Sequence, residues 1–274
     1  MKACYNVQTC MRKSDLEEDI RICAEVGFEA IEISFAKVEA FRKKYDILEL
    51  GQLLKKYNIK CGSINAIFNT SFCIGENWNR IQKQLDLACD ICQITGADCI
   101  IVLPDEITEE NRLLSEKKIL AASVRSLRKM ADYVSDKDVR IAFEPVGDML
   151  IGDIENAWEI VQQVDRENVG LTIDAFNLFL WDLLTDIESI ERISADKLFM
   201  VHINDAESIP FRKIDQMHRC MPGDGRIDVE RYIKCVKKTG YTGYVSVEVL
   251  NPYIWKKGAK IVIPEAYQKL KRFI

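Results

Sequence analysis

The chain has 274 residues, a net charge of −5, and a composition of 48% hydrophobic and 30% charged residues, the balance of an ordinary globular enzyme. Basic residues form no block, so binding to nucleic acid has no electrostatic support. No apolar run approaches the roughly 18 residues of a membrane-spanning helix, and the first residues lack a signal peptide. We therefore expect a cytoplasmic protein without a membrane partner. The composition is compatible with a homo-oligomer.

The ten cysteines are spread along the chain, and several lie inside apolar runs. In a chain of this length without a signal peptide, this distribution predicts free thiols that pack as small hydrophobic side chains. Cys89 and Cys92 form a C-x-x-C pair within an amphipathic helical pattern, and no second cysteine pair lies nearby. We interpret this pair as core packing rather than as a redox or zinc site.

A weak internal repeat organises the sequence. The stretches RICAEVGFEAIEIS (21–34), ICQITGADCIIVLP (91–104) and CVKKTGYTGYVSVE (235–248) each combine a helical segment, a glycine and an apolar or β-branched run. Glycine just past a helix adopts the left-handed conformation that ends the helix, and the run after it has the composition of a buried parallel strand. The repeating unit is therefore helix, short loop, strand.

In chain order, the pattern predicts strands at residues 2–8, 30–34, 60–67, 98–104, 139–144, 169–174, 198–203 and 244–249. Helical patterns lie between them, at 15–26 after the cap Ser14, and at 46–58, 77–95, 112–135, 153–164, 184–194 and 228–239, and a last helix at about 264–272 follows Pro264. Strands that alternate with helices indicate a parallel sheet, and eight units in this length predict a single (β/α)8 barrel domain over residues 1–274.

A doubly wound open sheet is the alternative to the barrel. Such a sheet usually carries a glycine-rich phosphate loop after its first strand, and YNVQTCMRKSD (5–15) contains no glycine. The longest irregular stretch, residues 204–226, follows the seventh predicted strand. Barrels keep their functional loops at this end of the strands.

Four late strands end in side chains that can bind a metal ion. These residues, here called the strand-end cluster, are Glu144, Asp174, His202 and Glu248. The carboxyl ends of barrel strands converge on one face, so we expect the four side chains to lie together. Three carboxylates and one imidazole suit one divalent ion such as Mn²⁺, Mg²⁺, Co²⁺ or Zn²⁺, and they do not form a sulfur-rich structural zinc site.

Each member of the strand-end cluster also has an ordinary structural explanation. Glu144 can be a capped strand end, Asp174 can cap a following turn, and His202 can be a satisfied core histidine. The combination is harder to explain in this way, because burial of three carboxylates without a cation is very costly. The sequence therefore favours a metal site.

Seven motifs spread over nearly the whole chain carry a family resemblance: MKACYN (1–6), INAIFN (64–69), FEPVG (143–147), RENVGLTIDAF (166–176), VHINDAE (201–207), PGDGRID (222–228) and GYVSVEVLNPYIW (243–255). On these motifs the sequence resembles the sugar isomerase/epimerase family of xylose-isomerase-like TIM barrels. The resemblance implies a divalent-metal-dependent isomerase of a small keto polyol, with an inosose as the favoured substrate.

The resemblance also implies roles for individual residues. It places the metal on the strand-end cluster and gives Glu144 and Glu248 the proton transfer, one as base and the other as acid. Such an enzyme removes a weakly acidic proton beside a carbonyl, and a metal stabilises the enediolate that results. Arg219, Asn177 and Asn65 are the implied substrate-binding residues, and the guanidinium would add to the stabilisation of the enediolate charge.

The chain departs from the family pattern at one substrate-binding position. Many members carry a histidine three residues after the aspartate of the sixth strand, where this chain has Asn177. An amide can bond to a hydroxyl group but cannot carry a proton at neutral pH, so the identity of the substrate stays open. Ketose 3-epimerases, inosose dehydratases and a non-catalytic sugar-binding barrel remain as alternatives.

Two further sequence patterns disfavour other activities of related proteins. Ketose 3-epimerases of the family follow the glutamate of the fifth strand with Pro-x-Asn and a further glutamate, whereas EPVGDML has Gly147 and Leu150. This difference disfavours a 3-epimerase. The related apurinic endonucleases use several more histidines for a three-metal cluster, and this chain has only two histidines.

Overall fold

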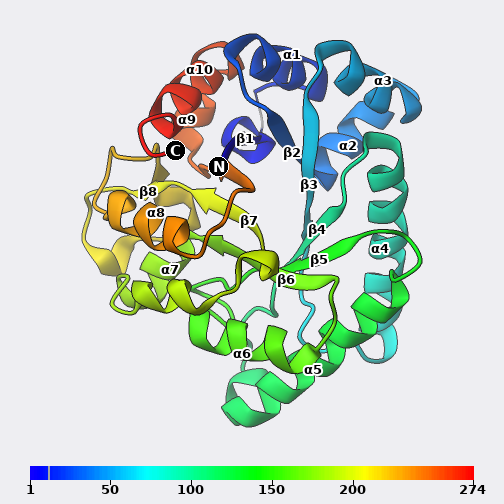
Figure 1. Ribbon diagram of the computed structural model, residues 1–274, viewed down its shortest axis with the longest axis vertical. Coiled ribbons are helices and arrows are strands. Elements are labelled where there is room, and N and C mark those ends of the chain that lie inside the picture. Colours follow the sequence, from blue (N-terminus) through cyan, green and yellow to red (C-terminus); the bar gives the residue numbers. More distant parts are fainter. Residues whose placement is uncertain (12) are drawn as a thin grey trace.

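A computed structural model describes residues 1–11 and 13–274 as a closed barrel of parallel strands surrounded by helices (Figure 1). The barrel strands are β1 (Lys2–Asn6), β2 (Ala30–Ser34), β3 (Lys60–Ile67), β4 (Cys99–Val102), β5 (Arg140–Phe143), β6 (Val169–Asp174), β7 (Leu198–Ile203) and β10 (Tyr244–Val247). They follow one another around the barrel, and β1 closes it by pairing with both β2 and β10. The predicted (β/α)8 barrel is confirmed, and this closure excludes the open sheet.

The helices form the outer layer of the barrel (Figure 1). They are α1 (Leu16–Val26), α2 (Phe35–Arg42), α3 (Leu48–Tyr57), α4 (Gly75–Thr95), α5 (Glu116–Tyr133), α6 (Ile154–Val164), α7 (Ala175–Asp182), α8 (Val229–Lys238), α9 (Pro252–Trp255) and α10 (Ala259–Leu270). As the repeat predicts, Gly27 and Gly96 end α1 and α4 in the left-handed conformation. The strands lie between this layer and the barrel axis, so almost every strand residue is buried.

Several predicted helix boundaries were wrong. The N-cap of α1 is Asp15 rather than Ser14, because the carboxylate of Asp15 accepts the backbone N–H of Glu18. The last helix begins at Ala259, so Pro264 lies inside it and does not start it. Proline removes one backbone hydrogen bond from the helix, but the apolar face of α10 packs against α1 and keeps the helix intact.

The predicted helix at 184–194 is a 3₁₀ helix over Ile187–Arg192. Its buried apolar residues, Leu184, Ile187, Ile190 and Ile193, recur at every third position. That spacing matches three residues per turn rather than 3.6. The short helices α2, α7 and α9 were not predicted, because each follows a strand directly or nearly so and is too short to show a helical period.

The irregular stretch after β7 folds back over the barrel mouth as a small antiparallel pair, β8 (Asp205–Ala206) with β9 (Arg219–Cys220). The buried carboxylate of Asp205 accepts backbone N–H groups of Gly223, Gly225 and Ile227. A Cβ on Gly225 would lie 2.1 Å from a backbone oxygen of Ala206, so only glycine fits at this approach. These contacts fix the position of Arg219 at the start of β9.

The ten cysteines are free thiols, as predicted. In the C-x-x-C pair, Cys92 is buried in α4 and Cys89 is half-buried. Burial raises the pKa of Cys89 to about 11, so its thiol is protonated near neutral pH. None of the described helices combines the length and the apolar character needed to cross a bilayer.

Candidate metal centre

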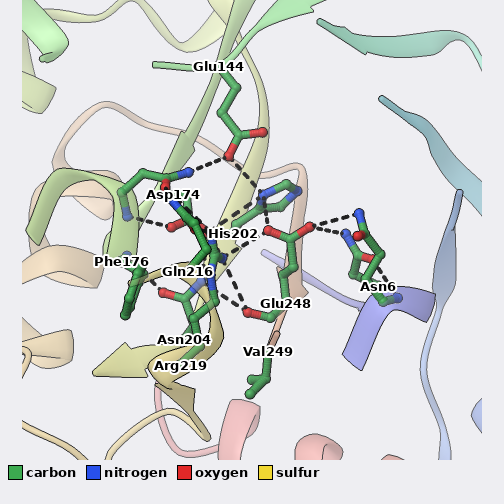
Figure 2. A network of polar contacts seen from close by, with 12 residues as sticks. Asn6, Glu144, Asp174, Phe176, His202, Asn204, Gln216, Arg219, Glu248 and Val249 are labelled. Carbon is green, nitrogen blue, oxygen red and sulfur yellow. Dashed lines mark hydrogen bonds and ion pairs between the residues drawn. The ribbon is translucent and has the colours of Figure 1, made fainter. Parts of the chain in front are cut away.

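The strand-end cluster occupies one arc of the barrel mouth, formed by the adjacent strands β5, β6, β7 and β10 (Figure 2). Asp174 and His202 lie at the carboxyl ends of β6 and β7, while Glu144 and Glu248 directly follow β5 and β10. All four side chains are buried, and one ligand atom from each lies within 4.8 Å of the others. The structure thus brings together the four residues that the strand ends suggested.

His202 lies at the centre of the strand-end cluster. Its Nδ1 atom is 3.3 Å from Glu248 Oε2, 3.5 Å from Glu144 Oε1 and 3.7 Å from Asp174 Oδ2. This nitrogen is fully buried and has no hydrogen-bond partner among the described residues. A buried polar atom normally has a partner, so the unpaired nitrogen and three converging carboxylates fit a divalent cation.

Arg219 enters the same site from β9. Its Nη1 atom is 2.9 Å from Asp174 Oδ2 and 3.0 Å from Glu248 Oε2, and its Nη2 donates to Gln216 Oε1 at 2.8 Å. The guanidinium is buried and lies over the ring of Phe176, 4.9 Å from its centre. The positive charge of Arg219 therefore compensates two of the three carboxylates and leaves Glu144 without a direct cationic contact from this side chain.

The two glutamates differ in charge state because their neighbours differ. Burial raises the pKa of Glu144 to about 7, an effect that His202 only partly opposes. Burial also opposes the ionisation of Glu248, but the charges of His202 and Arg219 outweigh it and lower its pKa to about 2. Burial disfavours the charged form of His202, yet Glu32, Glu248 and Glu144 together raise its pKa well above the usual value. The site therefore attracts positive charge, supplied by protons or by a metal.

Asp174 has a second role. As the sequence allowed, it is also the N-cap of α7, where its Oδ1 accepts the backbone N–H of Asn177 at 2.8 Å. Its Oδ2 faces the cluster and accepts from Asn204 and Arg219. The structural and the functional interpretations of this residue are therefore compatible, because the two carboxylate oxygens serve different partners.

Both asparagines predicted to bind substrate lie beside the cluster. Asn177 donates to Glu144 Oε1 at 2.9 Å and accepts from Gln216 at 3.0 Å. Asn65 donates to Glu248 Oε1 at 3.4 Å and to a further buried glutamate, Glu32. Both amides also line the cavity above the cluster, so they reach the space for a substrate while they hold the glutamates.

That cavity has a volume of about 430 Å³, within the usual range for a small-molecule site. Its lining mixes apolar and polar side chains: Gln8, Asn65, Phe68, Leu103, Glu106, Ile107, Glu144, Val146, Asp148, Met149, Asn177, Gln216, Arg219, Glu248 and Leu250. Glu144, Glu248 and Arg219 form part of its floor, so a bound molecule would reach the strand-end cluster directly.

Three residues of the site escaped the sequence analysis. Glu32 and Asn6 lie inside strands and hydrogen-bond to members of the cluster. The signal for Glu32 was a carboxylate in the middle of the apolar run AIEIS (30–34). Gln216 connects Asp148, Asn177 and Arg219 across the cavity, and no sequence pattern marks it. The neighbouring His218 instead pairs with Asp215 in its own loop.

The family model of the xylose isomerase-like TIM barrel matches residues 20–269. The chain belongs to this family. Inosose isomerase from Bacillus subtilis (strain 168) is 29% identical over 269 residues, which cover 97% of this chain and 95% of that protein. The resemblance carried by the seven motifs is thereby confirmed.

Other proteins that are similar to this chain differ in the activity or ligand described for them. A crystal structure of the IOLI protein with a bound zinc atom superimposes with a TM-score of 0.93 at 28% identity, over 100% of this chain and 99% of that one. A 3-dehydroshikimate dehydratase from Pseudomonas putida is 25% identical over 90% of this chain and 38% of its own length. Proteins similar to this chain thus include an isomerase, a zinc-binding protein and a dehydratase.

Replacement of His202 by alanine tests the metal assignment. We expect the wild-type protein to bind about one equivalent of Zn²⁺ or Mn²⁺ and the His202→Ala variant to lose most of it. At a metal concentration of about 100 Kd, binding to the folded state adds about 2.7 kcal/mol, a rise in Tm of roughly 5–10 °C for a chain of this size.

His218→Ala is the matched control, because the side chain of this second histidine contacts Asp215 in its own loop, away from the strand-end cluster. Metal content by atomic emission and Tm by calorimetry should match the wild type in this variant. Stoichiometric metal in His202→Ala would refute the assignment.

The pH dependence of metal binding gives a second test. Below about pH 7, Glu144 is protonated in the metal-free protein, and a metal must displace this proton and that of His202. Affinity should therefore rise with pH between about 6 and 8, and binding should release protons. Titration calorimetry in buffers of different ionisation enthalpy measures this release. A pH-independent affinity without proton release would contradict the charge states described here.

Proposed function

We propose that the protein is a divalent-metal-dependent isomerase that moves the carbonyl group of an uncharged keto polyol, with an inosose as the favoured substrate. The observation that carries this proposal is the strand-end cluster at the floor of a cavity with a mixed polar and apolar lining. The inosose isomerases, which align with 97% of this chain, support the choice of substrate.

The proposed roles follow from the different surroundings of the two glutamates. A divalent ion on the strand-end cluster would polarise the carbonyl and hydroxyl oxygens of the substrate. Glu248, which is ionised beside Arg219, accepts the proton from the carbon next to the carbonyl. Glu144, whose pKa burial raises to about 7 in the metal-free protein, takes up the proton of the substrate hydroxyl and delivers it to the former carbonyl carbon, while Glu248 passes the abstracted proton to the former carbonyl oxygen. Groups with pKa values held apart in this way suit acid and base roles.

Arg219 and Asn177 orient the reacting groups in this proposal. Asn177 donates to Glu144 and is itself held by Gln216, so the acid keeps one orientation. Arg219 lines the cavity, so its guanidinium lies close enough to orient a substrate oxygen. Negative charge that develops on the substrate would be stabilised by the guanidinium.

The charges around the cavity favour a neutral substrate. Among the described residues that line it, Arg219 is the only cationic side chain, and two carboxylates already share its charge. The lining also contains Glu106 and Asp148. The three carboxylates of the strand-end cluster balance the charges of Arg219 and of one divalent ion. Burying the charge of a carboxylate or phosphate needs a further cation, so an anion such as 3-dehydroshikimate or a sugar phosphate fits this cavity poorly.

We extend the proposal to the protein as a whole. Residues 1–274 form one barrel domain, and the ten free thiols suit a reducing cytoplasm. The substrate is a small molecule, and nothing in the charge distribution favours nucleic acid.

Incubation of the metal-loaded protein with candidate substrates in D₂O tests the proposal. We expect deuterium at the carbon next to the carbonyl of a keto-inositol, together with the rearranged ketone, and no reaction with 3-dehydroshikimate. NMR distinguishes the outcomes. Loss of water would indicate a dehydratase, inversion at carbon 3 of a ketose would indicate a 3-epimerase, and no exchange with any substrate would indicate a sugar-binding barrel.

The Glu248→Gln variant separates proton transfer from metal binding in the same assay. Glutamine keeps the shape and one oxygen ligand but cannot accept the proton, so exchange should fall about 10²–10⁴-fold while metal content persists. If metal and exchange disappear in parallel, Glu248 is a ligand and the base is another residue.

A further inference from the structure

A buried carboxylate outside both the strand-end cluster and the cavity lining lies in the middle of β2. Glu32 is 0% exposed, and its contacts with β1, β3 and β7 show that it points into the barrel. Its neighbours Ile31 and Ile33 belong to the main hydrophobic core on the other face of the strand. A charge in this position is costly unless donors surround it, so the partners of Glu32 indicate what it does.

The carboxylate of Glu32 has a donor on each oxygen. Oε1 accepts from the side-chain amide of Asn6 and from Asn65 Nδ2 at 2.8 Å. Oε2 lies 3.1 Å from His202 Nε2, and both side chains of this pair are completely buried. Glu32 is thus compensated by two amides and one imidazole.

The contact with His202 determines which imidazole nitrogen faces the cluster. A carboxylate can only accept, so the hydrogen between Glu32 and His202 must reside on Nε2. When one imidazole nitrogen holds a proton in this way, the other is left as the metal ligand. That other nitrogen, Nδ1, is the buried atom without a hydrogen-bond partner that faces Glu144, Asp174 and Glu248.

The two asparagines connect Glu32 to a second member of the cluster. Asn6 Nδ2 also donates to Glu248 Oε1 at 2.8 Å, and Asn65 Nδ2 approaches the same oxygen at 3.4 Å. An amide group has two hydrogens, so each asparagine can bridge the two carboxylates. Asn6 is held in turn by the backbone N–H of Gln8, which donates to its Oδ1 at 2.9 Å. The orientation of Glu248 therefore depends on Glu32.

We propose that Glu32 is a positioning residue of the metal centre, which holds His202 with Nδ1 toward the ion and, through Asn6 and Asn65, fixes the carboxylate of Glu248. The proposal rests on the metal centre of the proposed function. Among the described residues, Glu32 is absent from the cavity lining and contacts Asn6, Asn65 and His202, so it acts through the ligands and not on the substrate. Carboxylates that orient a metal-binding histidine usually change metal affinity by about 10–100-fold when they are removed.

The protonation of His202 can be observed by NMR, because the chain contains few histidines. His202 and His218 are the only two histidines, so histidine-selective ¹⁵N labelling gives two imidazole patterns. In the Zn²⁺-loaded protein, His202 should show a downfield, slowly exchanging Nε2–H proton and a metal-shifted Nδ1. His218, whose side chain is 32% exposed, should exchange rapidly with solvent.

Glu32→Gln is the informative substitution, because glutamine keeps the volume but must present an N–H to one of the three donors. We expect Zn²⁺ affinity, measured by competition with a chelator, to fall about 10–100-fold and the Nε2–H signal of His202 to shift or broaden. Glu39→Gln removes an exposed carboxylate from α2, the helix that follows β2, and should leave both measurements unchanged.

The outcomes separate this proposal from the metal assignment. If the wild type binds Zn²⁺ and Glu32→Gln matches it in affinity and in the His202 spectrum, the role of Glu32 is overturned while the metal centre stands. If the wild type binds no metal at these residues, both fail. Should Glu32→Gln not fold, the wild-type spectrum alone decides, because a His202 bound through Nε2, or one without a protected Nε2–H, contradicts the proposal.

Discussion

The burial of three converging carboxylates at the barrel mouth is the constraint on which the rest of the site depends. Glu144, Asp174 and Glu248 converge on one imidazole nitrogen, and burial makes each negative charge costly. Arg219 compensates Asp174 and Glu248 but makes no direct contact with Glu144, whose pKa is raised chiefly by burial and to a lesser degree by the two neighbouring carboxylates. A divalent ion would compensate all three at once, and the same imbalance makes Glu144 the more readily protonated of the two glutamates.

The ligands of the metal centre and the residues that hold them come from different strands of the barrel. The strand-end cluster comes from β5, β6, β7 and β10, whereas the supporting groups Asn6, Glu32 and Asn65 come from β1, β2 and β3 on the other side of the axis. The loop after β7 adds Arg219 and Gln216, and the hydrogen bonds of Asp205 to the backbone keep this loop folded back. Ligands, their supports and the substrate-facing groups thus lie on different segments that only the closed barrel brings together.

The sequence predicts only those parts of the site that are marked by a pattern of neighbouring residues. Glycine-terminated helices followed by apolar runs predicted the barrel, and polar residues at strand ends predicted the cluster. Glu32 was missed because it lies in the middle of AIEIS, whereas only polar residues at strand ends indicated the site. The role of Gln216 depends on contacts across 39 and 68 residues of chain, and no local pattern encodes such contacts. Pro264 caused a different error. It predicted the start of a helix, but the tertiary packing of α10 overrides this local preference and the helix continues through the proline.

The most direct test of the account is a crystal structure of the Mn²⁺- or Zn²⁺-loaded protein, with diffraction data collected on both sides of the metal absorption edge. We predict one anomalous peak in the barrel, bound by carboxylate oxygens of Glu144, Asp174 and Glu248 and by Nδ1 of His202, with Nε2 of His202 still on Glu32. A metal bound elsewhere, or one that leaves two or more of these four side chains unbound, would contradict the central claim.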